Sequence, residues 1–236
     1  MSLFKVYSFS TIGPRGKNED CCRVEHSANS LLACLADGVG GNKCGDVASQ
    51  YTVSRFFEEL KVNSEINLTD SLLSIHNEIK QKGDNDIKCS GMATTFTGCV
   101  ITNNLARIIH VGDSRLYWLR GNGIKQLTQD HTEVAELLRR GKLTKEEALV
   151  YPRRNILQSA IGTEKAPSLQ EITFEGIVGD RILISSDGFY EVFSKLKLRD
   201  VSLQFKKFEM FTQTIVKQLM SSKLNDNSSF IAIEIL

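Results

Sequence analysis

The sequence has no apolar run long enough to span a membrane, and its first residues lack the pattern of a signal peptide. Its formal net charge is only +1, so it also lacks the basic excess of nucleic-acid-binding proteins. These absences argue against a membrane protein and against nucleic acid as a partner. The 236 residues, 41% hydrophobic and 24% charged, suffice for one domain with a substantial core. We expect a single soluble, monomeric domain over residues 1–236.

The six cysteines do not form the paired CxxC pattern of a zinc site. Cys34 and Cys99 lie within apolar runs, and we expect both to be small core residues. This usage favours a reducing, cytoplasmic setting. A cysteine-based phosphatase is excluded, because no cysteine is followed by an arginine six positions later.

Other common catalytic signatures are absent as well. The sequence contains neither a GxxxxGK[ST] phosphate-binding loop nor a GxSxG nucleophile elbow. The run from Gly38 to Gly40 lacks the third glycine of a dinucleotide fingerprint. Among the histidines, His76 and His110 are expected to be packed residues, while the role of His131 stays open.

The sequence does contain a repeated pattern in which an apolar strand ends at an aspartate beside glycine. Residues 31–36 are the longest such run, and they lead directly into an aspartate and a glycine. The aspartates that follow apolar runs are Asp37, Asp113 and Asp187, and a fourth, Asp226, precedes an apolar strand near the C-terminus. One aspartate beside a turn glycine usually marks only a turn. Four at strand ends predict one carboxylate-rich site.

The candidate ligands of this site are all oxygen donors. They are Glu19, Asp20, Asp37, Asp113, Asp187, Asp226 and the carbonyl group of Gly38. Such donors suit the hard cations Mg²⁺ and Mn²⁺. Because so many carboxylates around one ion would repel one another, we expect at least two ions. Paired ions about 3.5–4 Å apart are typical of enzymes that hydrolyse phosphate esters.

Arg15 lies in the turn-rich segment that also carries Glu19 and Asp20. Its guanidinium group could bind a phosphate with two parallel hydrogen bonds. Alternatively, Arg15 could only neutralise the two acids that follow it. Residue type and spacing leave these two interpretations open.

Strands and helices alternate in the predicted structure, which indicates a mixed α+β layered fold. We expect helices near residues 45–60 and from an N-cap at Thr69, where Leu68 and Leu73 would form a hydrophobic staple. A meander of short strands follows, and two short helices come after it. The remaining predicted ranges are strands at 4–10, 94–102, 105–111, 115–119, 123–127, 171–174, 181–185 and 229–235, and helices at 132–141, 144–150 and 205–219.

Eight short motifs, in register along the whole chain, resemble those of the 2C-type metal-dependent Ser/Thr protein phosphatases in their bacterial single-domain form. The motifs are Arg15-x-x-Asn18-Glu19-Asp20, Asp37-Gly38-Val39-Gly40-Gly41, Met92-Ala93-Thr94-Thr95, Val111-Gly112-Asp113-Ser114-Arg115, Leu127-Thr128-x-Asp130-His131, Asn155-x-Leu157 through Ala160-Ile161-Gly162, Ser186-Asp187-Gly188 and Asp226-Asn227. The resemblance implies a four-layer α-β-β-α sandwich: two antiparallel-rich sheets flanked by helices, with a metal cleft at one edge.

The resemblance also implies a role for each candidate residue. Asp37 would bridge two Mn²⁺ or Mg²⁺ ions. Asp187 and Asp226 would complete the coordination of the first ion, and Glu19 with the Gly38 carbonyl would complete that of the second. Asp113, with Asp187, would hold a third ion, Asp20 would orient metal-bound water, and Arg15 would bind phosphate. Residues 136–160 would form a variable flap beside the cleft. A metal-bridging hydroxide would attack phosphoserine or phosphothreonine of a protein in line, and a Ser/Thr kinase would oppose the enzyme.

The sequence departs from the family pattern at four positions. Val39 stands where some members carry a histidine proposed as general acid, so the donor to the leaving oxygen is open. Ala93, His110 and Gln158 also differ from the usual residues, which bears on substrate preference. Two rival interpretations are a non-catalytic regulatory module on the same fold and a two-metal phosphodiesterase. The presence of every expected acid argues against the first, and the near-neutral charge against the second.

Overall fold

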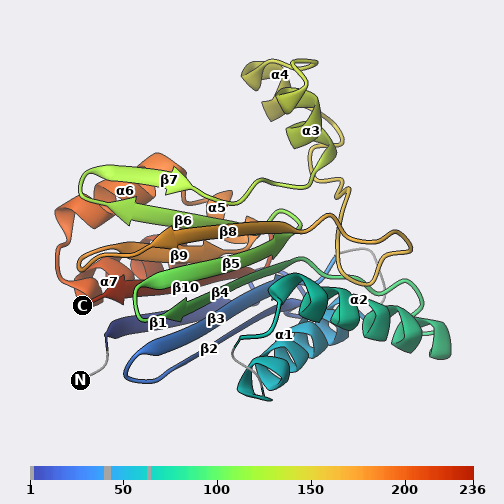
Figure 1. Ribbon diagram of the computed structural model, residues 1–236. Helices are drawn as coiled ribbons and strands as arrows, with labels where there is room; N and C mark the ends of the chain where they lie inside the picture. Colours follow the sequence, from blue (N-terminus) through green and yellow to red (C-terminus); the bar gives the residue numbers. More distant parts are fainter. Residues whose placement is uncertain (1–2, 40–43, 63–64) are drawn as a thin grey trace.

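The computed structural model describes residues 3–39, 44–62 and 65–236. Within this part, ten strands form two antiparallel five-stranded sheets that pack face to face (Figure 1). One sheet has the order β1-β10-β9-β6-β7 and the other has the order β2-β3-β4-β5-β8. The strands are β1 (Phe4–Thr11), β2 (Asp20–His26), β3 (Ser30–Asp37), β4 (Phe96–Thr102), β5 (Leu105–Val111), β6 (Arg115–Arg120), β7 (Gly123–Gln126), β8 (Gln170–Glu175), β9 (Arg181–Ser185) and β10 (Ser228–Ile235).

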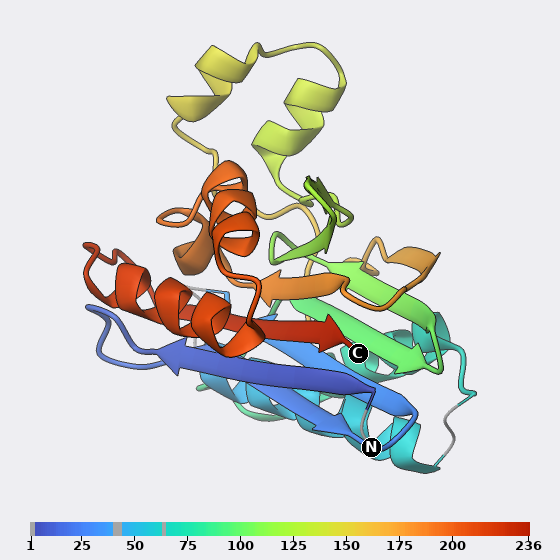
Figure 2. The same cartoon turned by 90° about the vertical axis from the view of Figure 1, so that its left-hand side faces the viewer.

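Helices cover the outer face of each sheet, so the expected α-β-β-α sandwich is confirmed (Figures 1 and 2). Helices α1 and α2 pack on the sheet that contains β3, and α6 and α7 pack on the sheet that contains β10. Helices α3 and α4 stand away from the sandwich. The helices are α1 (Gly45–Val62), α2 (Leu68–Asn85), α3 (Glu133–Arg139), α4 (Lys145–Leu149), α5 (Asp187–Tyr190), α6 (Lys195–Gln204) and α7 (Phe208–Met220).

Strand β3 is buried on both faces, which explains its continuous apolar sequence. Leu31, Ala33 and Leu35 point into the core between the two sheets. Cys34 and Ala36 point the other way, into the layer beneath α1 and α2. Alternate residues of a strand face opposite sides, so a strand that is covered twice needs apolar residues throughout. The strand that ends at Asp37 is therefore fixed by packing on both sides.

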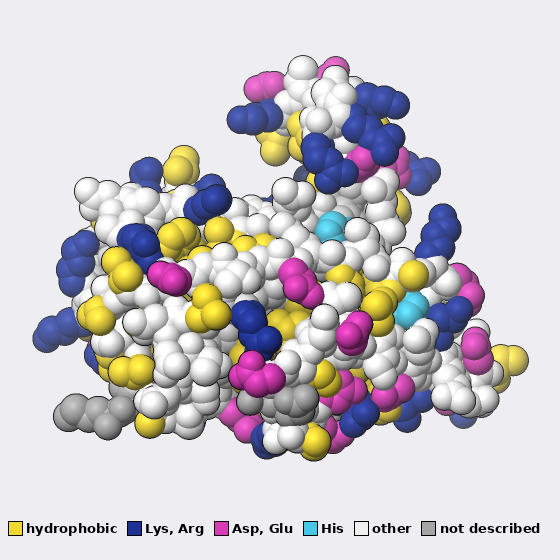
Figure 3. Space-filling view, viewed as in Figure 1, with side chains coloured by type: hydrophobic (Ala, Val, Ile, Leu, Met, Phe, Trp, Pro, Cys, Tyr) yellow, Lys and Arg dark blue, Asp and Glu magenta, His cyan; other side chains and the backbone are white. Residues whose placement is uncertain are grey.

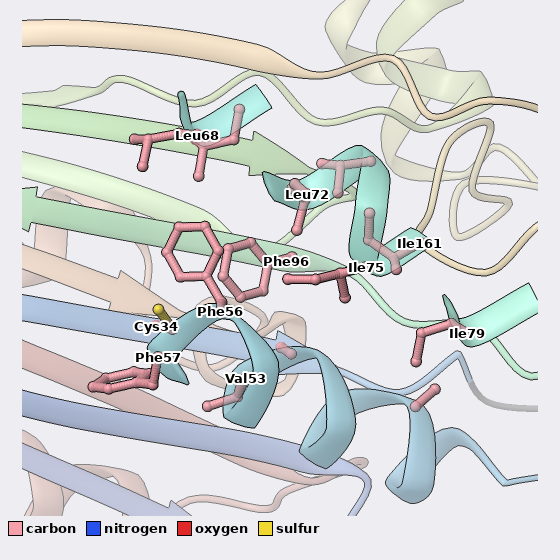
Figure 4. Close-up of a cluster of buried hydrophobic side chains, with 14 of the residues drawn as sticks. Cys34, Val53, Phe56, Phe57, Leu68, Leu72, Ile75, Ile79, Phe96 and Ile161 are labelled. Atoms are coloured by element: carbon pink, nitrogen blue, oxygen red, sulfur yellow. The ribbon is translucent and has the colours of Figure 1, made fainter. Parts of the chain in front are cut away.

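The outer layer over β3 is formed by apolar stripes on the two long helices (Figure 4). Leu68, Leu72, Ile75 and Ile79 recur at helical spacing along α2 and are all buried. They meet aromatic residues of α1 and β4, where the rings of Phe56 and Phe96 lie edge to face with centroids 4.8 Å apart. His76 is buried on α2, as predicted, and its Nδ1 accepts a hydrogen bond from the N–H of Gly162.

The predicted N-cap and hydrophobic staple of the second helix are wrong, and the elements β2 and α6 were not predicted at all. The N-cap of α2 is Asn67, whose side chain accepts a hydrogen bond from the N–H of Asp70, and not Thr69. Leu68 therefore lies inside the helix, where it cannot act as the residue before the cap. Strand β2 was not predicted because it is an edge strand whose residues are mostly half-buried. Helix α6 was also missed, because only Leu198 and Val201 of its ten residues are buried.

The structure contains a disulfide between Cys44 and Cys89, which the cysteine pattern did not predict. Cys44 directly precedes α1, and Cys89 follows α2, so the bond closes a ring around both helices. Cys34 and Cys99 are fully buried, as expected for core residues. A disulfide is less usual in the reducing setting inferred from the sequence, and the compartment itself stays a prediction. In the described residues, no helix is long and apolar enough to cross a membrane.

We predict that breaking the Cys44–Cys89 bond lowers the thermal stability of the protein. The cysteines are 45 residues apart, and closing a ring of that size removes about 4 kcal/mol of unfolded-chain entropy in the loop-closure model. The melting temperature should fall on reduction and in the Cys44→Ser/Cys89→Ser variant, while reductant should not change the melting temperature of that variant. Alkylation of the denatured chain checks the bond itself: six reactive thiols before reduction would contradict it.

Candidate active site

Antiparallel pairing brings the predicted acids to the same end of the sandwich. Asp20, the first residue of β2, lies directly opposite Asp37, the last residue of β3. In the other sheet, Ser185 at the end of β9 pairs with Arg115 at the start of β6 and with Phe230 near the start of β10. Asp113 and Asp226 lie shortly before those two strands, and Asp187 lies just after β9. In antiparallel strands, the start of one strand lies beside the end of its neighbour. The acids at these starts and ends therefore lie at the same end of the sandwich.

These residues line one polar cleft with a volume of about 390 Å³. Its wall is completed by Asn155 and Leu157, which follow α4 in the chain. Helix α4 itself stands away from the sandwich (Figure 1). The lining residues are Arg15, Glu19, Asp37, Gly38, Val39, Thr95, Asp113, Asn155, Leu157, Asp187, Asp226 and Asn227. The cleft thus collects seven of the eight predicted site residues. The eighth, Asp20, is buried next to Asp37.

Burial and mutual repulsion raise the pKa values of the central acids. The pKa of Asp37 is well above its usual value because of burial and the negative charges of Asp20, Asp187 and Asp113. The pKa of Asp187 rises to about 6 because of burial and the charge of Asp226. Carboxylates so close together are stable in their ionised form only when positive charge balances them. The cleft therefore favours a cationic ligand.

Asp20 is held by a polar cluster beneath the cleft. Its Oδ2 accepts a hydrogen bond from the hydroxyl of Ser186 at 2.8 Å, and the N–H of Ser229 donates to the oxygen of the same serine. Its Oδ1 is buried and has no hydrogen-bond partner among the described residues. Burial raises the pKa of Asp20 to about 7, and the charges of Asp187 and Asp226 add to this effect. A buried carboxylate oxygen without a donor indicates an interaction beyond the chain itself.

Asp113 lies in a turn that neighbouring side chains hold in place. Gly112 before it has φ +106°, and a Cβ there would lie 2.5 Å from the Cβ of Thr95, so the turn requires glycine. The N–H of Gly112 donates to Nδ1 of His131, which stands behind this turn and does not line the cleft. Burial and the charges of Asp187 and Asp130 raise the pKa of Asp113 to about 8.

Glu19 and Gly38 also line the cleft, and their backbones are linked to each other. The N–H of Gly38 donates to the carbonyl oxygen of Glu19 at 3.0 Å. A Cβ at Gly38 would lie 2.4 Å from backbone atoms of Gly45, so only glycine allows α1 to begin so close to this strand end. Gly40 and Gly41, which the sequence analysis grouped with Gly38, lie outside the described residues.

Arg15 reaches the cleft and pairs with Asp226. Its Nη2 lies 2.5 Å from Oδ2 of Asp226, and its side chain is 54% exposed. The alternative interpretation named Glu19 and Asp20 as its partners, and neither is paired with it here. An exposed guanidinium group next to a polar cleft can turn toward an anionic ligand at small cost.

The cleft residues suit divalent cations in their donor chemistry. All the candidate side-chain donors are carboxylates, and Asp20, whose Oδ1 has no hydrogen-bond partner among the described residues, lies opposite Asp37. Among the described residues, no three His, Cys, Asp or Glu side chains are yet arranged closely enough to hold an ion.

Sequence reasoning missed part of the supporting structure. The sequence pattern identified Asn227 only as the neighbour of Asp226. Its side chain accepts a hydrogen bond from the N–H of Glu19 and donates hydrogen bonds to the carbonyl oxygens of Ile12 and Lys17. The hydroxyl oxygen of Thr95 accepts a hydrogen bond from the N–H of Asp37 at 3.0 Å. Residue spacing gives no sign of either role, because both depend on contacts between segments that are far apart in the sequence.

Comparisons with known proteins agree with this geometry. The protein phosphatase 2C family model matches residues 15–227. Protein phosphatase PhpP of Streptococcus pneumoniae is 33% identical to this chain over 215 residues, which cover 86% of this chain and 85% of PhpP.

Solved structures give the same result. The serine/threonine phosphatase Stp1 from Staphylococcus aureus superposes with a TM-score of 0.90 at 26% identity, over 100% of this chain and 98% of Stp1. The catalytic domain of the serine/threonine phosphatase PstP, solved in complex with two manganese ions, superposes with a TM-score of 0.82 at 28% identity, over 99% and 98% of the two chains. The fold, the acid-lined cleft and the family match together show that this chain belongs to the protein phosphatase 2C family and is a serine/threonine protein phosphatase.

Proposed function

We propose that the acid-lined cleft is where this phosphatase hydrolyses phosphoserine and phosphothreonine of protein substrates. The observation that carries the proposal is the convergence of acids from separate strands and loops on one polar cleft, with Arg15 beside them. The lining residues that the structure describes include no Ser, Cys or His. The hydroxyl of Thr95, which also lines the cleft, is engaged with the N–H of Asp37 and the hydroxyl of Ser114, and the carboxylates are assigned to cations. Direct transfer of the phosphoryl group to water, without a phospho-enzyme, is therefore the mechanism that we propose.

Activity depends on Mn²⁺ or Mg²⁺, as in the family to which the chain belongs. Bound ions would lower the pKa of a water nucleophile and balance the charge of the phosphate oxygens. Asp37 would contact two ions. Asp187 and Asp226 would complete the coordination of the first ion, and Glu19 and the Gly38 carbonyl would complete that of the second. A third ion would lie at Asp113 and Asp187. The raised pKa values of Asp37, Asp113 and Asp187 support these assignments, because cations would relieve the same repulsion.

The remaining site residues would bind and orient. Arg15 would hold the phosphate through its guanidinium group, which lies at the cleft and is half exposed. Asp20, fixed by Ser186 and with one oxygen free, would accept a proton or hydrogen bond from the nucleophile. With Val39 in the cleft wall in place of a histidine, the group that protonates the leaving oxygen is not supplied by that position.

We further propose that residues 1–236 are one catalytic domain and that residues 136–160 form a flap beside the cleft. The flap carries many Lys and Arg side chains (Figure 3). Several of them pair with acids: Arg139 and Arg140 with Glu136, and Arg153 with Glu133. Because much of this charge is neutralised locally, the flap does not resemble a nucleic-acid surface. The partners we propose are phosphorylated proteins and a Ser/Thr kinase that the enzyme opposes, in the cytoplasm.

The proposal is tested first by removing metal. Exhaustive chelation should abolish hydrolysis of a phosphothreonine peptide, because the proposed water nucleophile depends on bound ions for its lowered pKa, and Mn²⁺ or Mg²⁺ should restore the activity. Release of inorganic phosphate is the measurement. Full activity in the presence of chelator would refute a metal-dependent mechanism at this cleft.

Asp37 and Asp113 should differ in what they bind. Asp37→Asn should abolish activity and lower the Mn²⁺ stoichiometry by about two, because this carboxylate would serve both paired ions. Asp113→Ala should retain the pair, weaken one further ion and still reduce turnover. Titration calorimetry with Mn²⁺ on both variants decides the assignment. It is wrong if Asp113→Ala empties the pair while Asp37→Asn keeps it.

Arg15→Ala should raise KM for phosphate esters and leave Mn²⁺ binding nearly intact. The expected loss in kcat/KM corresponds to about 2–4 kcal/mol, as for a charge-assisted contact in a partly dry site. Arg15→Lys should recover only part of the lost kcat/KM, because an ammonium group cannot form the two parallel hydrogen bonds of a guanidinium group. Wild-type kinetics in Arg15→Ala would mean that the arginine only balances the charge of Asp226.

A further inference from the structure

Asp46, the second residue of α1, is a buried acid that the ligand set above does not use. The residue is 9% exposed. One carboxylate oxygen, Oδ2, forms an ion pair with Nζ of Lys17 at 2.6 Å. The other, Oδ1, is buried and has no hydrogen-bond partner among the described residues. A buried carboxylate oxygen that lacks a donor is costly, so its presence here needs an explanation.

The backbone places Asp46 next to Glu19 and Gly38. Gly45 directly precedes it, and a Cβ at Gly45 would lie 2.9 Å from Oε1 of Glu19 and 3.2 Å from the carbonyl carbon of Gly38. Asp46 does not line the cleft itself, but it lies one residue from the backbone that packs against Glu19 and Gly38, so its negative charge is close to both.

Two ordinary roles of such an acid do not account for this arrangement. An acid in the first turn of a helix is stabilised by the helix dipole, but such a residue is normally solvated, as Asp70 is in the first turn of α2. The ion pair with Lys17 occupies only Oδ2, and the Lys17 side chain is 63% exposed. Neither role explains a second oxygen that is buried without a donor.

We propose that Asp46 is a positioning residue for the divalent cation that Glu19 and the Gly38 carbonyl hold. It would strengthen binding through its negative charge, and its free oxygen would accept a hydrogen bond from one of the waters that Mg²⁺ and Mn²⁺ retain. The inference rests on the proposed function only in that the cleft binds such cations.

Lys17 makes the inference sharply testable, because its charge acts in the opposite sense. Nζ of Lys17 lies 2.6 Å from Oδ2 of Asp46, so its positive charge lies directly beside the negative charge that Asp46 contributes. A cation next to Glu19 would be attracted by Asp46 and repelled by Lys17. If Asp46 served only to anchor Lys17, removal of either partner would have the same effect.

The experiment is Mn²⁺ titration calorimetry on the full, metal-free chain. Asp46→Asn should weaken one Mn²⁺ site by about 10–100-fold, the usual cost of losing such a supporting group. Lys17→Met should tighten the same site by a few-fold, about the effect of removing one nearby exposed charge. Asp70→Asn is the matched control for the helix dipole and should leave all Mn²⁺ affinities unchanged.

The inference is overturned if Asp46→Asn binds Mn²⁺ like the wild type, or if Lys17→Met weakens the site as Asp46→Asn does. Should Asp46→Asn fail to fold, Asp46→Ser takes its place: a weakened Mn²⁺ site in that variant supports the inference, and wild-type affinity contradicts it. Asp37→Asn separates this outcome from a failure of the proposed function. If that variant also keeps every Mn²⁺ ion, the cleft is not the metal site; if it loses them while Asp46→Asn does not, only the role of Asp46 is wrong.

Discussion

Repulsion between buried carboxylates is the constraint on which the active end of this molecule depends. Asp20, Asp37, Asp113 and Asp187 all have raised pKa values, and in each case neighbouring acids contribute. Their strands cannot separate to relieve the repulsion, because β3 is packed on both faces and β9 is buried throughout. The stability of the two-sheet core thus keeps a cluster of acids together that would otherwise spread into solvent. The cleft is preorganised for positive charge.

Hydrogen bonds from a few polar side chains couple the two sheets at this end. Asn227 joins the segment that carries Arg15 and Glu19 to the entrance of β10. Ser186 joins Asp20 of one sheet to Ser229 of the other. A shift of either sheet would therefore move residues proposed for metal binding and for phosphate binding together. This coupling gives the site a single geometry even though its residues come from distant parts of the sequence.

The sequence predicted what depends on pattern and missed what depends on tertiary contact. The apolar runs before Asp37, Asp113 and Asp187 identified both the strands and the acids at their ends, because burial on two faces demands continuous apolar residues. Strand β2 escaped prediction, since an edge strand that is half-exposed has no strong periodicity.

The cap of α2 illustrates a second limit. Asn67 and Thr69 are both acceptable N-cap residues, and only the backbone conformation distinguishes them. Asp46 illustrates a third, because an acid in the first turn of a helix is ordinary in sequence and becomes unusual only when one of its oxygens is buried without a donor.

The Cys44–Cys89 bond also changes how the chain responds to force. It ties the start of α1 to the segment after α2, so the intervening chain cannot be drawn out while the bond is intact. At about 3.3–3.6 Å per extended residue, the ring withholds on the order of 150 Å of contour length from any pull on the two ends. A machine that threads proteins through a narrow pore would have to pass two strands of chain side by side at this point. The helices that cover β3 are therefore the part of the chain that such a pull cannot draw out until the bond is reduced.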